Sequence, residues 1–366
     1  GKTVQVIPHI TDEIKMGIRA GAAPCDGEPA PDVAITEIGG TVGDIESLPF
    51  LEAIRQFSLE VGVHDCMFIH LTLLPYLRAP GELKSKPTQQ SVGKLREIGI
   101  QPHVLVCRTE VAMDEEMAKK ITLFCNVREE AVIEEKDVDF SIYEVPLMLI
   151  TAGLDQRILN HLELKPTKKL DTTDWQQLLE VVKHPEHEVT IAVAGKYIEL
   201  HDAYKSIYES LQHAGNHHAC NVKLRKVSAE QIAGEGADEL LKGVDGILVP
   251  GGFGERGFEG KIATIRYARV NKIPFLGICY GMQAAVVEYA RTELGITDAI
   301  TSEYGADASN PVINLMEEQK AVSNLGGTMR LGAFDCELKP GTLSHKAYGT
   351  EMVSERHRHR YEFNNA

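Results

Sequence analysis

Short β-branched runs alternate with helical segments along most of the chain, and this alternation restricts the fold more than any other feature. Up to about residue 165 the predicted strands are "TVQVIPHI", "DVAITEI", "CMFIHLTLL", "HVLVCRT" and "AVIEEKDV". Helical patterns such as "LPFLEAIRQFSLEVG" and "DEEMAKKITLFCN" stand between them. Such alternation predicts an α/β fold with a mainly parallel sheet, whose ligands bind at the carboxyl ends of the strands.

One interruption of this alternation predicts two domains. Between residues 166 and 188 the composition becomes polar and charged, and Pro166 and Pro185 bracket one short helix, so this segment is the expected linker. A second α/β series begins at "VTIAVAGKY" and continues through "DGILVPGG" and "IPFLGIC". We therefore expect domains at 1–165 and 189–366, and 366 residues are enough for each to bury its own core.

Charge and cysteine content exclude several classes of protein. A formal net charge of -15 and a pI near 5.4 argue against a general nucleic-acid binder. The sequence has neither an apolar run of the roughly 18 residues needed for a membrane span nor a signal-peptide pattern. Seven scattered cysteines without a C-x-x-C pair are typical of a reducing compartment and give no structural zinc site. We expect a cytoplasmic protein that binds neither nucleic acid nor membranes.

The stretch "FLGICYGMQA" places Cys279 between a predicted strand and a predicted helix. A sharp strand-to-helix turn lifts a nucleophile above its sheet, and the flanking glycines permit the strained backbone. The helix N-terminus is expected to lower the pKa of the thiol. Upstream, "VPGGFGERG" ends another strand in glycines whose N–H groups can face an oxyanion at Cys279. A core cysteine beside an ordinary glycine turn is the alternative, but the two features together favour a nucleophile.

Acidic residues follow a predicted strand in "EIGGTVGDIES", which places Glu37 at the strand end and Asp44 and Glu46 after a glycine turn. Such carboxylates suit Mg²⁺ with a triphosphate, because Mg²⁺ takes one or two carboxylates plus phosphate oxygens and water. Surface acids that cap a helix are an equally good interpretation of these residues alone.

A basic loop, "ELKSKPTQQS", carries Lys84 and Lys86 before a helix expected to begin near Thr88. Point charges next to a helix N-terminus suit a triphosphate. A solvated basic loop is the ordinary alternative.

Taken in order, "EIGGTVGDIES", "KSKPTQ", "PGGFGERG", "LGICYGMQ", "LGGTMRLG" and "ERHRHRYE" closely resemble the CTP synthase family over nearly the whole chain. The resemblance implies a P-loop-type synthetase (amidoligase) domain at 1–165 and a class I glutamine amidotransferase domain at 189–366, both incomplete. It further implies a ligase of de novo pyrimidine nucleotide biosynthesis. ATP would phosphorylate the 4-oxygen of UTP, and ammonia from glutamine hydrolysis would travel inside the protein and displace the phosphate to give CTP.

The resemblance also implies roles for individual residues. Cys279 would be the nucleophile that attacks the glutamine amide. The glutamine-binding residues would be Gly252, Tyr280, Gly281, Met282, Gln283, Glu303 and Arg360. UTP or the inhibitory product CTP would contact Asp44, Ile45, Glu46, Lys84, Ser85, Lys86, Pro87, Thr88, Gln89 and Lys120. ATP would contact Lys136, Asp137 and Val138, and Glu37 would bind Mg²⁺.

Several features depart from the family or go beyond the residues. The family usually has Leu where Tyr280 stands, and a side chain so near the nucleophile is expected to affect glutamine access. It usually has Thr where Ser85 stands, which keeps the hydroxyl, and "DVDFSIY" carries one residue more than some relatives. The resemblance also implies activation by GTP and a homotetramer.

Two motifs look functional but are expected not to be. The family takes the His and Glu of its thiol site from an "HPE"-type motif far downstream of the cysteine, whereas this chain has "HPE" upstream, at His184 to Glu186. We expect these to be solvated linker residues. "GKT" at residues 1–3 resembles the end of a phosphate loop, but a strand pattern follows where a helix is needed. We therefore expect an internal piece that lacks both the phosphate loop and the base of Cys279.

Three alternatives stay open on the sequence. Another glutamine amidotransferase fused to a nucleotide enzyme would share "GICYGMQ" but should lack "KSKPTQ" and "GTVGDIES". A non-enzymatic relic would keep nucleotide binding or assembly contacts without a complete site. A cysteine hydrolase activity of the second domain alone would give thiol labelling that UTP does not affect.

Overall fold

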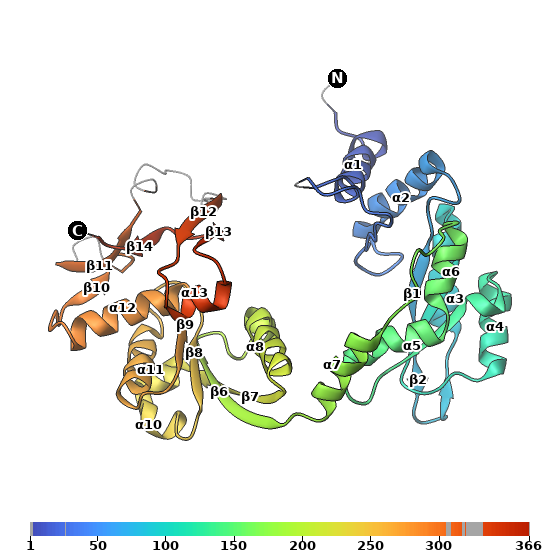
Figure 1. The fold of residues 1–366 in the computed structure, drawn as a ribbon. Helices are drawn as coiled ribbons and strands as arrows, with labels where there is room; N and C mark the ends of the chain where they lie inside the picture. Colours follow the sequence, from blue (N-terminus) through green and yellow to red (C-terminus); the bar gives the residue numbers. More distant parts are fainter. Residues whose placement is uncertain (1–2, 26, 305–308, 317–318, 320–331, 366) are drawn as a thin grey trace. The chain divides into compact units, whose positions relative to one another are not determined.

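Two compact units make up the chain, residues 1–179 and 180–366. The computed structural model describes residues 3–25, 27–304, 309–316, 319 and 332–365 (Figure 1). Each unit contains a parallel sheet flanked by helices, so the predicted α/β class is confirmed. The helix expected in the linker is α7 (Thr173–Lys183), which spans the division between the units. The domain boundaries given above stay predictions.

A three-stranded parallel sheet organises the first unit. Its order is β1-β4-β5, with β1 at Ile69–Leu74, β4 at Val104–Thr109 and β5 at Val132–Lys136. Central strand β4 is buried at all but one position, as its unbroken apolar run "VLVC" predicts for a strand covered on both faces. Its last residue pairs with the last residues of β1 and β5, so the three carboxyl ends are level.

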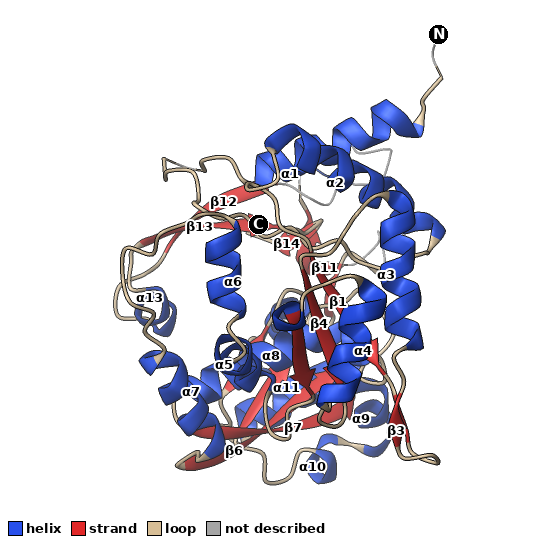
Figure 2. Cartoon of the chain, turned by 90° about the vertical axis from the view of Figure 1, so that its right-hand side faces the viewer, coloured by secondary structure: helices blue, strands red, loops and turns tan. Residues whose placement is uncertain are grey.

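Helices cover both faces of this sheet. Helices α3 (Lys86–Ile98) and α4 (Glu115–Cys125) lie on one face of the sheet (Figure 2). Val92 of α3 and Ile121 of α4 pack there with Leu105. Leu149 of α5 (Val145–Thr151) and Leu154 of α6 (Leu154–His161) pack against Val104 and Val106 on the other. The unit therefore has three layers, with loops free to form a site at the carboxyl edge of the sheet.

Two of the strands predicted for this unit are wrong. "TVQVIPHI" instead leads through a π-helical turn, η1 (Val6–Ile10), into α1 (Thr11–Gly21), and "DVAITEI" contains no strand. Most β-branched side chains of both segments are exposed, Ile35 at 92%. A β-branched run becomes a strand only where a neighbouring strand and a buried face accept it. The strand argument against "GKT" as a phosphate loop therefore also fails, and Gly1 and Lys2 lie outside the described residues.

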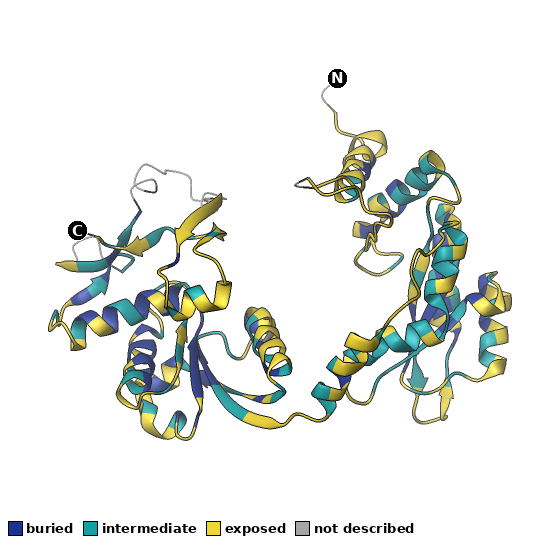
Figure 3. Ribbon diagram, in the orientation of Figure 1, coloured by how far each residue is buried: buried dark blue, intermediate teal, exposed yellow. Residues whose placement is uncertain are grey.

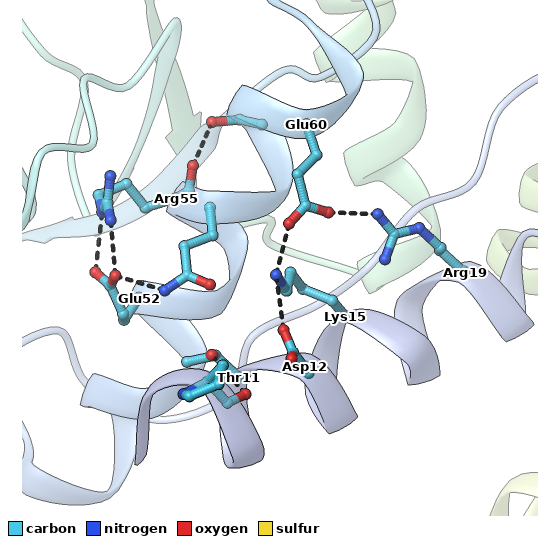
Figure 4. A network of polar contacts seen from close by, with 10 residues as sticks. Thr11, Asp12, Lys15, Arg19, Glu52, Arg55 and Glu60 are labelled. Atoms are coloured by element: carbon cyan, nitrogen blue, oxygen red, sulfur yellow. Dashed lines mark hydrogen bonds and ion pairs between the residues drawn. The ribbon is translucent and has the colours of Figure 1, made fainter. Parts of the chain in front are cut away.

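Ion pairs attach α1 to α2 (Leu48–Val61) (Figure 4). The ammonium of Lys15 lies 3.0 Å from Asp12 and 2.6 Å from Glu60, and Arg19 pairs with Glu60 as well. Lys15 is buried although its partners are partly exposed. Helix α1 is thus joined to the unit by charged contacts on its polar face.

A four-stranded parallel sheet organises the second unit, and all three strand predictions made for this half are confirmed. The order is β7-β6-β8-β9, with β7 at Cys220–Ser228, β6 at His187–Gly195, β8 at Gly246–Val249 and β9 at Phe275–Gly277. The chain builds outward from β6 in one direction to β7 and in the other to β8. Such a reversal opens a crevice beyond the carboxyl ends of the strands.

The second sheet is also covered on both faces, and its centre is the most buried part of the unit (Figure 3). Helices α9 (Ala229–Glu235), α11 (Phe258–Val270) and α12 (Tyr280–Thr292) share one core with β6 and β8. Helix α8 (Lys205–His217) packs on the opposite face through Tyr208. The loops after β8 and β9 are thereby held on a rigid base.

Smaller elements complete the described part of the chain. They are η2 (Ile45–Ser47), β2 (Tyr76–Leu77), β3 (Glu82–Leu83), η3 (Glu129–Ala131), η4 (Ile142–Glu144), η5 (His201–Tyr204), α10 (Ala237–Leu240), β10 (Ala299–Thr301), β11 (Asn310–Leu315), β12 (Gly332–Glu337), α13 (Leu343–Tyr348), β13 (Met352–His357) and β14 (Tyr361–Phe363). Apart from Gly332, the motif "LGGTMRLG" lies outside the described residues. None of the helices described is both long and apolar enough to cross a membrane.

Candidate active site

Cys279 lies on the predicted strand-to-helix turn, between β9 and α12. Its backbone has φ 53° and ψ -110°, a conformation that a residue with a side chain rarely adopts. The turn also requires the glycine that follows, because a Cβ at Gly281 would lie 2.0 Å from the carbonyl oxygen of Val249. Strain of this kind at a polar residue indicates a functional position.

The glycine loop, residues 250–254 after β8, lies directly against this thiol. A Cβ built on Gly251 would be 3.4 Å from the Cβ of Cys279 and 3.6 Å from its Sγ. The backbone N–H groups of Gly252 and Tyr280 are both close enough to the sulfur to lower the thiol pKa. Two backbone donors that converge at a nucleophile are what an oxyanion formed there requires.

The protonation of Cys279 differs from the expectation made on its place at a helix N-terminus. Burial raises the pKa of the thiol above its usual value, and this outweighs the lowering by Tyr280 N–H, Gly252 N–H and the ammonium of Lys261. The prediction of a lowered pKa is therefore wrong. The free-energy cost of desolvating a half-buried thiolate exceeds the stabilisation that these donors and the ammonium give it. A thiol of this kind needs a proton acceptor before it can attack a carbonyl.

Residues predicted to bind glutamine gather around the start of α12. Glu303 accepts a hydrogen bond from the backbone N–H of Gly254 at 2.7 Å, next to Gly252. Gln283 donates from Nε2 to the carbonyl oxygen of Tyr361 at 2.9 Å, which brings the segment containing Arg360 to the same helix. Burial raises the pKa of Cys279 and of Tyr361, and the nearby charge of Glu303 adds to both shifts. Met282, by contrast, is 44% exposed.

Tyr280 occupies the core rather than the surface. It is 1% exposed, its ring centroid is 5.7 Å from that of Phe258, and its hydroxyl donates to the carbonyl oxygen of Gly254 at 2.7 Å. The departure from Leu at this position therefore adds a contact under the glycine loop.

The "HPE" residues lie at the opposite edge of the second sheet. His184 and Glu186 are exposed, as expected, and Glu186 N–H donates to the carbonyl oxygen of Ala219. They precede β6, whose nine residues rise for roughly 30 Å before reaching the carboxyl edge where Cys279 lies. This His and Glu cannot serve the thiol in this arrangement.

In the first unit, the basic residues predicted to bind UTP meet at one corner. Lys84 pairs with Glu82, and Lys84 and Lys120 together lower the pKa of that carboxyl. The ammonium of Lys86 lies 5.8 Å from the ring centroid of Phe124 on α4, the helix that also carries Lys120. The corner thus combines three ammonium groups from two helices and the loop between β3 and α3.

The hydroxyl and amide side chains of the same motif serve the fold. Helix α3 begins at Lys86, two residues before the expected start, with Pro87 in the first turn, where its fixed φ suits a helix. Thr88 is buried and donates to the carbonyl oxygen of Leu73 at 3.1 Å, and Gln89 donates to Ser85 Oγ at 3.0 Å. These contacts fix the start of α3 against β1.

The residues predicted to contact ATP lie at the carboxyl edge of the first sheet. Lys136 ends β5, the backbone N–H of Asp137 donates to the carbonyl oxygen of Thr109, and Val138 follows in a loop. The Asp137 carboxylate accepts from Nε of Arg108 at 2.8 Å. Their position is the one that the parallel sheet predicts for ligand contacts.

The segment 37–46, which contains the carboxylates predicted to bind Mg²⁺ and the pyrimidine nucleotide, is largely exposed. Glu37, which was expected at a strand end, lies in a loop, and Asp44, Ile45 and Glu46 are exposed as well. Ile38 and Val42 of this segment pack on the cluster containing Leu51 and Leu95, which anchors it to α2 and α3. Within the described residues, no group of three or more His, Cys, Asp or Glu side chains is arranged to hold a metal ion. An exposed single carboxylate such as Glu37 fits Mg²⁺ only together with phosphate oxygens and water.

Sequence reasoning missed Lys261, a fully buried residue of α11 beside the thiol. A signal was present in "FEGKIATI", where Phe258, Lys261, Ile262 and Ile265 follow the i, i+3, i+4, i+7 spacing of one helix face. A lysine on the apolar face of a helix must either reach solvent or find a buried partner.

A strained thiol at a strand-to-helix turn, faced by two backbone donors at the carboxyl edge of a parallel sheet, defines a thiol-dependent α/β enzyme site. Residues 199–366 match the family described as glutamine amidotransferase class-I, and residues 1–164 match the family described as CTP synthase N-terminus.

Whole-chain relatives agree with both matches. The CTP synthase of Caldanaerobacter subterraneus is 56% identical over 365 residues, and that of Geotalea uraniireducens is 57% identical over 366. Each alignment covers 100% of this chain and 67% of the relative. The chain belongs to the CTP synthase family. A solved structure titled "Trypanosoma brucei CTPS - glutaminase domain with bound acivicin" is 38% identical, covers 48% of this chain and 68% of its own, and has a TM-score of 0.44.

Proposed function

We propose that this chain takes part in the ATP-dependent amination of UTP to CTP with ammonia released from glutamine. The observation that carries the proposal is the geometry at Cys279, where a strained thiol faces the N–H groups of Gly252 and Tyr280. Relatives named CTP synthase match along the whole chain, which supports this hypothesis and not a non-enzymatic relic.

The residues divide the work between two sites. Cys279 would attack the glutamine amide carbon, and the two N–H groups would bind the oxygen as it becomes negative. Glu303, Gln283 and Arg360 would hold glutamine together with Gly252, Gly281 and Met282.

In the first unit, the basic corner of Lys84, Lys86 and Lys120 would bind the triphosphate of UTP or CTP. Support comes from the concentration of positive charge at the first turn of α3, where free backbone N–H groups also favour phosphate. Ser85, Pro87, Thr88 and Gln89 would shape this loop, while Asp44, Ile45 and Glu46 would contact the pyrimidine nucleotide. Lys136, Asp137 and Val138 would contact ATP.

Mg²⁺ is the proposed cofactor, with Glu37 as its protein ligand. When bound with a triphosphate, it offsets the negative charge on the phosphate oxygens. The family further suggests activation by GTP and a cytoplasmic homotetramer. Seven free thiols, as this chain has, are typical of a reducing compartment.

The test is Cys279→Ala compared with Cys336→Ala, which removes an exposed thiol on β12. In the intact enzyme we expect Cys279→Ala to abolish CTP formation from glutamine but to keep CTP formation from added ammonium salts. Cys336→Ala should keep both. Loss of both activities in Cys279→Ala, or survival of the glutamine-dependent one, would contradict the proposed division of labour.

A further inference from the structure

Lys261 is the least explained residue near Cys279. It lies on α11, is 0% exposed, and donates from Nζ to the carbonyl oxygen of Pro250 at 3.2 Å. The same ammonium lies 4.4 Å from the ring centroid of Tyr280. A buried charge with a carbonyl and an aromatic face as partners is costly, so its presence calls for a role.

Four side chains hold the glycine loop, each at a different backbone group. Lys261 donates to Pro250 O, Lys196 donates to Phe253 O, and Tyr280 donates to Gly254 O. Glu303 accepts from Gly254 N–H. Gly251 and Gly252 lie between these anchors and against the thiol, so the anchors decide where Gly252 N–H points.

Lys261 and Tyr280 act as a pair, because the ammonium lies over the ring whose hydroxyl binds the loop. If Lys261 were lost, Pro250 would lose its donor and Tyr280 its cation. If the tyrosine were a leucine, the loop would lose the Gly254 contact and the ammonium would lose its aromatic face. Tyr280 thus gives the loop a support that a leucine side chain could not give.

We propose that Lys261 and Tyr280 are positioning residues of the thiol site: they hold the glycine loop so that Gly252 N–H faces the sulfur, and the buried ammonium stabilises the thiolate of Cys279. This inference rests on the proposed role of Cys279 as nucleophile. It goes further in assigning the support of the oxyanion donor to a lysine and a tyrosine in the core.

The charges around Lys261 agree with this role. Burial and the neighbouring Lys196 lower the pKa of Lys261 to about 8, while Cys279 and Glu303 act to raise it. In turn Lys261 lowers the pKa of Cys279. The ammonium and the thiolate therefore stabilise each other, and Lys196, Glu303 and Tyr280 are the other charged or titratable groups that take part.

The first experiment measures the alkylation rate of Cys279 by iodoacetamide between pH 6 and pH 10, followed by mass spectrometry of the peptide that contains it. The full chain is used, with Cys25 as an internal exposed reference thiol. Lys261→Met should slow alkylation at pH 7.5 by roughly threefold or more and move the profile to higher pH, because a nearby positive charge is lost. The matched control is Lys226→Met, since Lys226 lies 4.6 Å from the ring centroid of Tyr208 but is exposed and belongs to β7, at the other edge of the sheet from β9.

The second experiment separates positioning from stability in the intact enzyme. Tyr280→Phe keeps the ring under the ammonium and removes only the hydroxyl, so it should fold, move the alkylation profile less than Lys261→Met does, and lower kcat for glutamine hydrolysis with little change in KM. Tyr280→Leu should both lower kcat and move the profile. An unchanged profile in Lys261→Met, or an unchanged kcat in Tyr280→Phe, overturns the proposal.

A different result tests the function itself. If Cys279→Ala hydrolyses glutamine as the parent enzyme does, the proposed function fails, whatever the alkylation profiles show. If that variant is inactive and the profiles of Lys261→Met and Lys226→Met coincide, only the role of Lys261 fails.

Discussion

Replacing Lys261 by methionine should change the stability of the second unit in a way that depends on pH. The folded pKa of about 8 and the ordinary value of 10.5 differ by about 2.5, which corresponds to about 3 kcal/mol against burying the charged form. Because the folded pKa is lowered, the unfolded chain binds more protons between these two values. Stability from this residue therefore rises with pH from about 8 to 10.5 and is lowest below pH 8.

The magnitude follows from the same values. Between pH 7 and pH 9 the parent protein should gain about 1.4 kcal/mol from deprotonation of Lys261, a tenfold change in a local opening equilibrium. Lys261→Met lacks this gain. Loss of the donor to Pro250 O costs about 1 kcal/mol, but equally at both pH values, so it cancels in the comparison. The raised pKa of Tyr280 acts in the opposite direction at higher pH and is present in both proteins. The still higher thiol pKa of Cys279 expected in Lys261→Met would add to the difference in the same sense.

Hydrogen–deuterium exchange of peptides that cover α11 measures this difference. Comparing variant and parent at the same pH removes the intrinsic pH dependence of exchange. The protection of the variant relative to the parent should be higher at pH 7 than at pH 9 by about tenfold. Lys226→Met should give the same ratio at both pH values. An equal ratio for Lys261→Met at pH 7 and pH 9 would refute the reasoning, because it would mean that Lys261 does not titrate between them.

Three further predictions concern single residues. Lys84→Ala should weaken UTP binding in the intact enzyme by about tenfold, the loss of a charge-assisted contact, and leave glutamine hydrolysis nearly unchanged. Isothermal titration calorimetry would measure the UTP affinity. The control is Lys94→Ala, because Lys94 pairs with Glu97 on the exposed surface of α3. If Lys84→Ala bound UTP as tightly as this control, the basic corner would not be part of the nucleotide site. Glu288→Ala should cost about 2 kcal/mol or more in urea unfolding, because Glu288 is 1% exposed and binds Arg269 at 2.9 Å, whereas Glu293→Ala should cost much less. Gly281→Ala should prevent correct folding of the second unit, because its Cβ would lie 2.0 Å from the carbonyl oxygen of Val249. Gly17→Ala should be tolerated, because no atom lies within 4 Å of the added Cβ. Circular dichroism would compare the two variants, and equal spectra and stabilities would contradict the packing described at the turn.

The sequence predicted well what local patterns decide. Continuous apolar runs such as "VLVC" became buried parallel strands, and the glycines around Cys279 predicted its turn. The two failed strands show the limit of that signal. "TVQVIPHI" and "DVAITEI" have the composition of strands, but their side chains are exposed and the sheet of the first unit contains neither. Strand formation depends on a partner elsewhere in the chain, which composition does not reveal.

The protonation state of the site was beyond the reach of sequence for the same reason. A helix N-terminus can be recognised from the pattern around Cys279, and it favours a thiolate. How far the thiol is desolvated depends on how the glycine loop and α11 cover it. This desolvation is the reason why the pKa of the thiol is raised and not lowered. Lys261 has the same limit. Its place on the apolar face of α11 could be predicted from the i, i+3, i+4 spacing, but its buried partner, the carbonyl oxygen of Pro250, could not.

Burial of Cys279 and support of the glycine loop together suggest how the site divides its tasks. Burial raises the pKa of the Cys279 thiol, so we expect it to be protonated near neutral pH and to need a proton acceptor before it attacks a carbonyl. The proposed oxyanion donors are held by the contacts that Lys261, Lys196, Tyr280 and Glu303 make with the backbone of the glycine loop. Preorganised donors lower the barrier only once charge develops on the substrate oxygen. In the proposed mechanism, removal of the thiol proton therefore comes first, and the backbone donors act as the thiolate attacks.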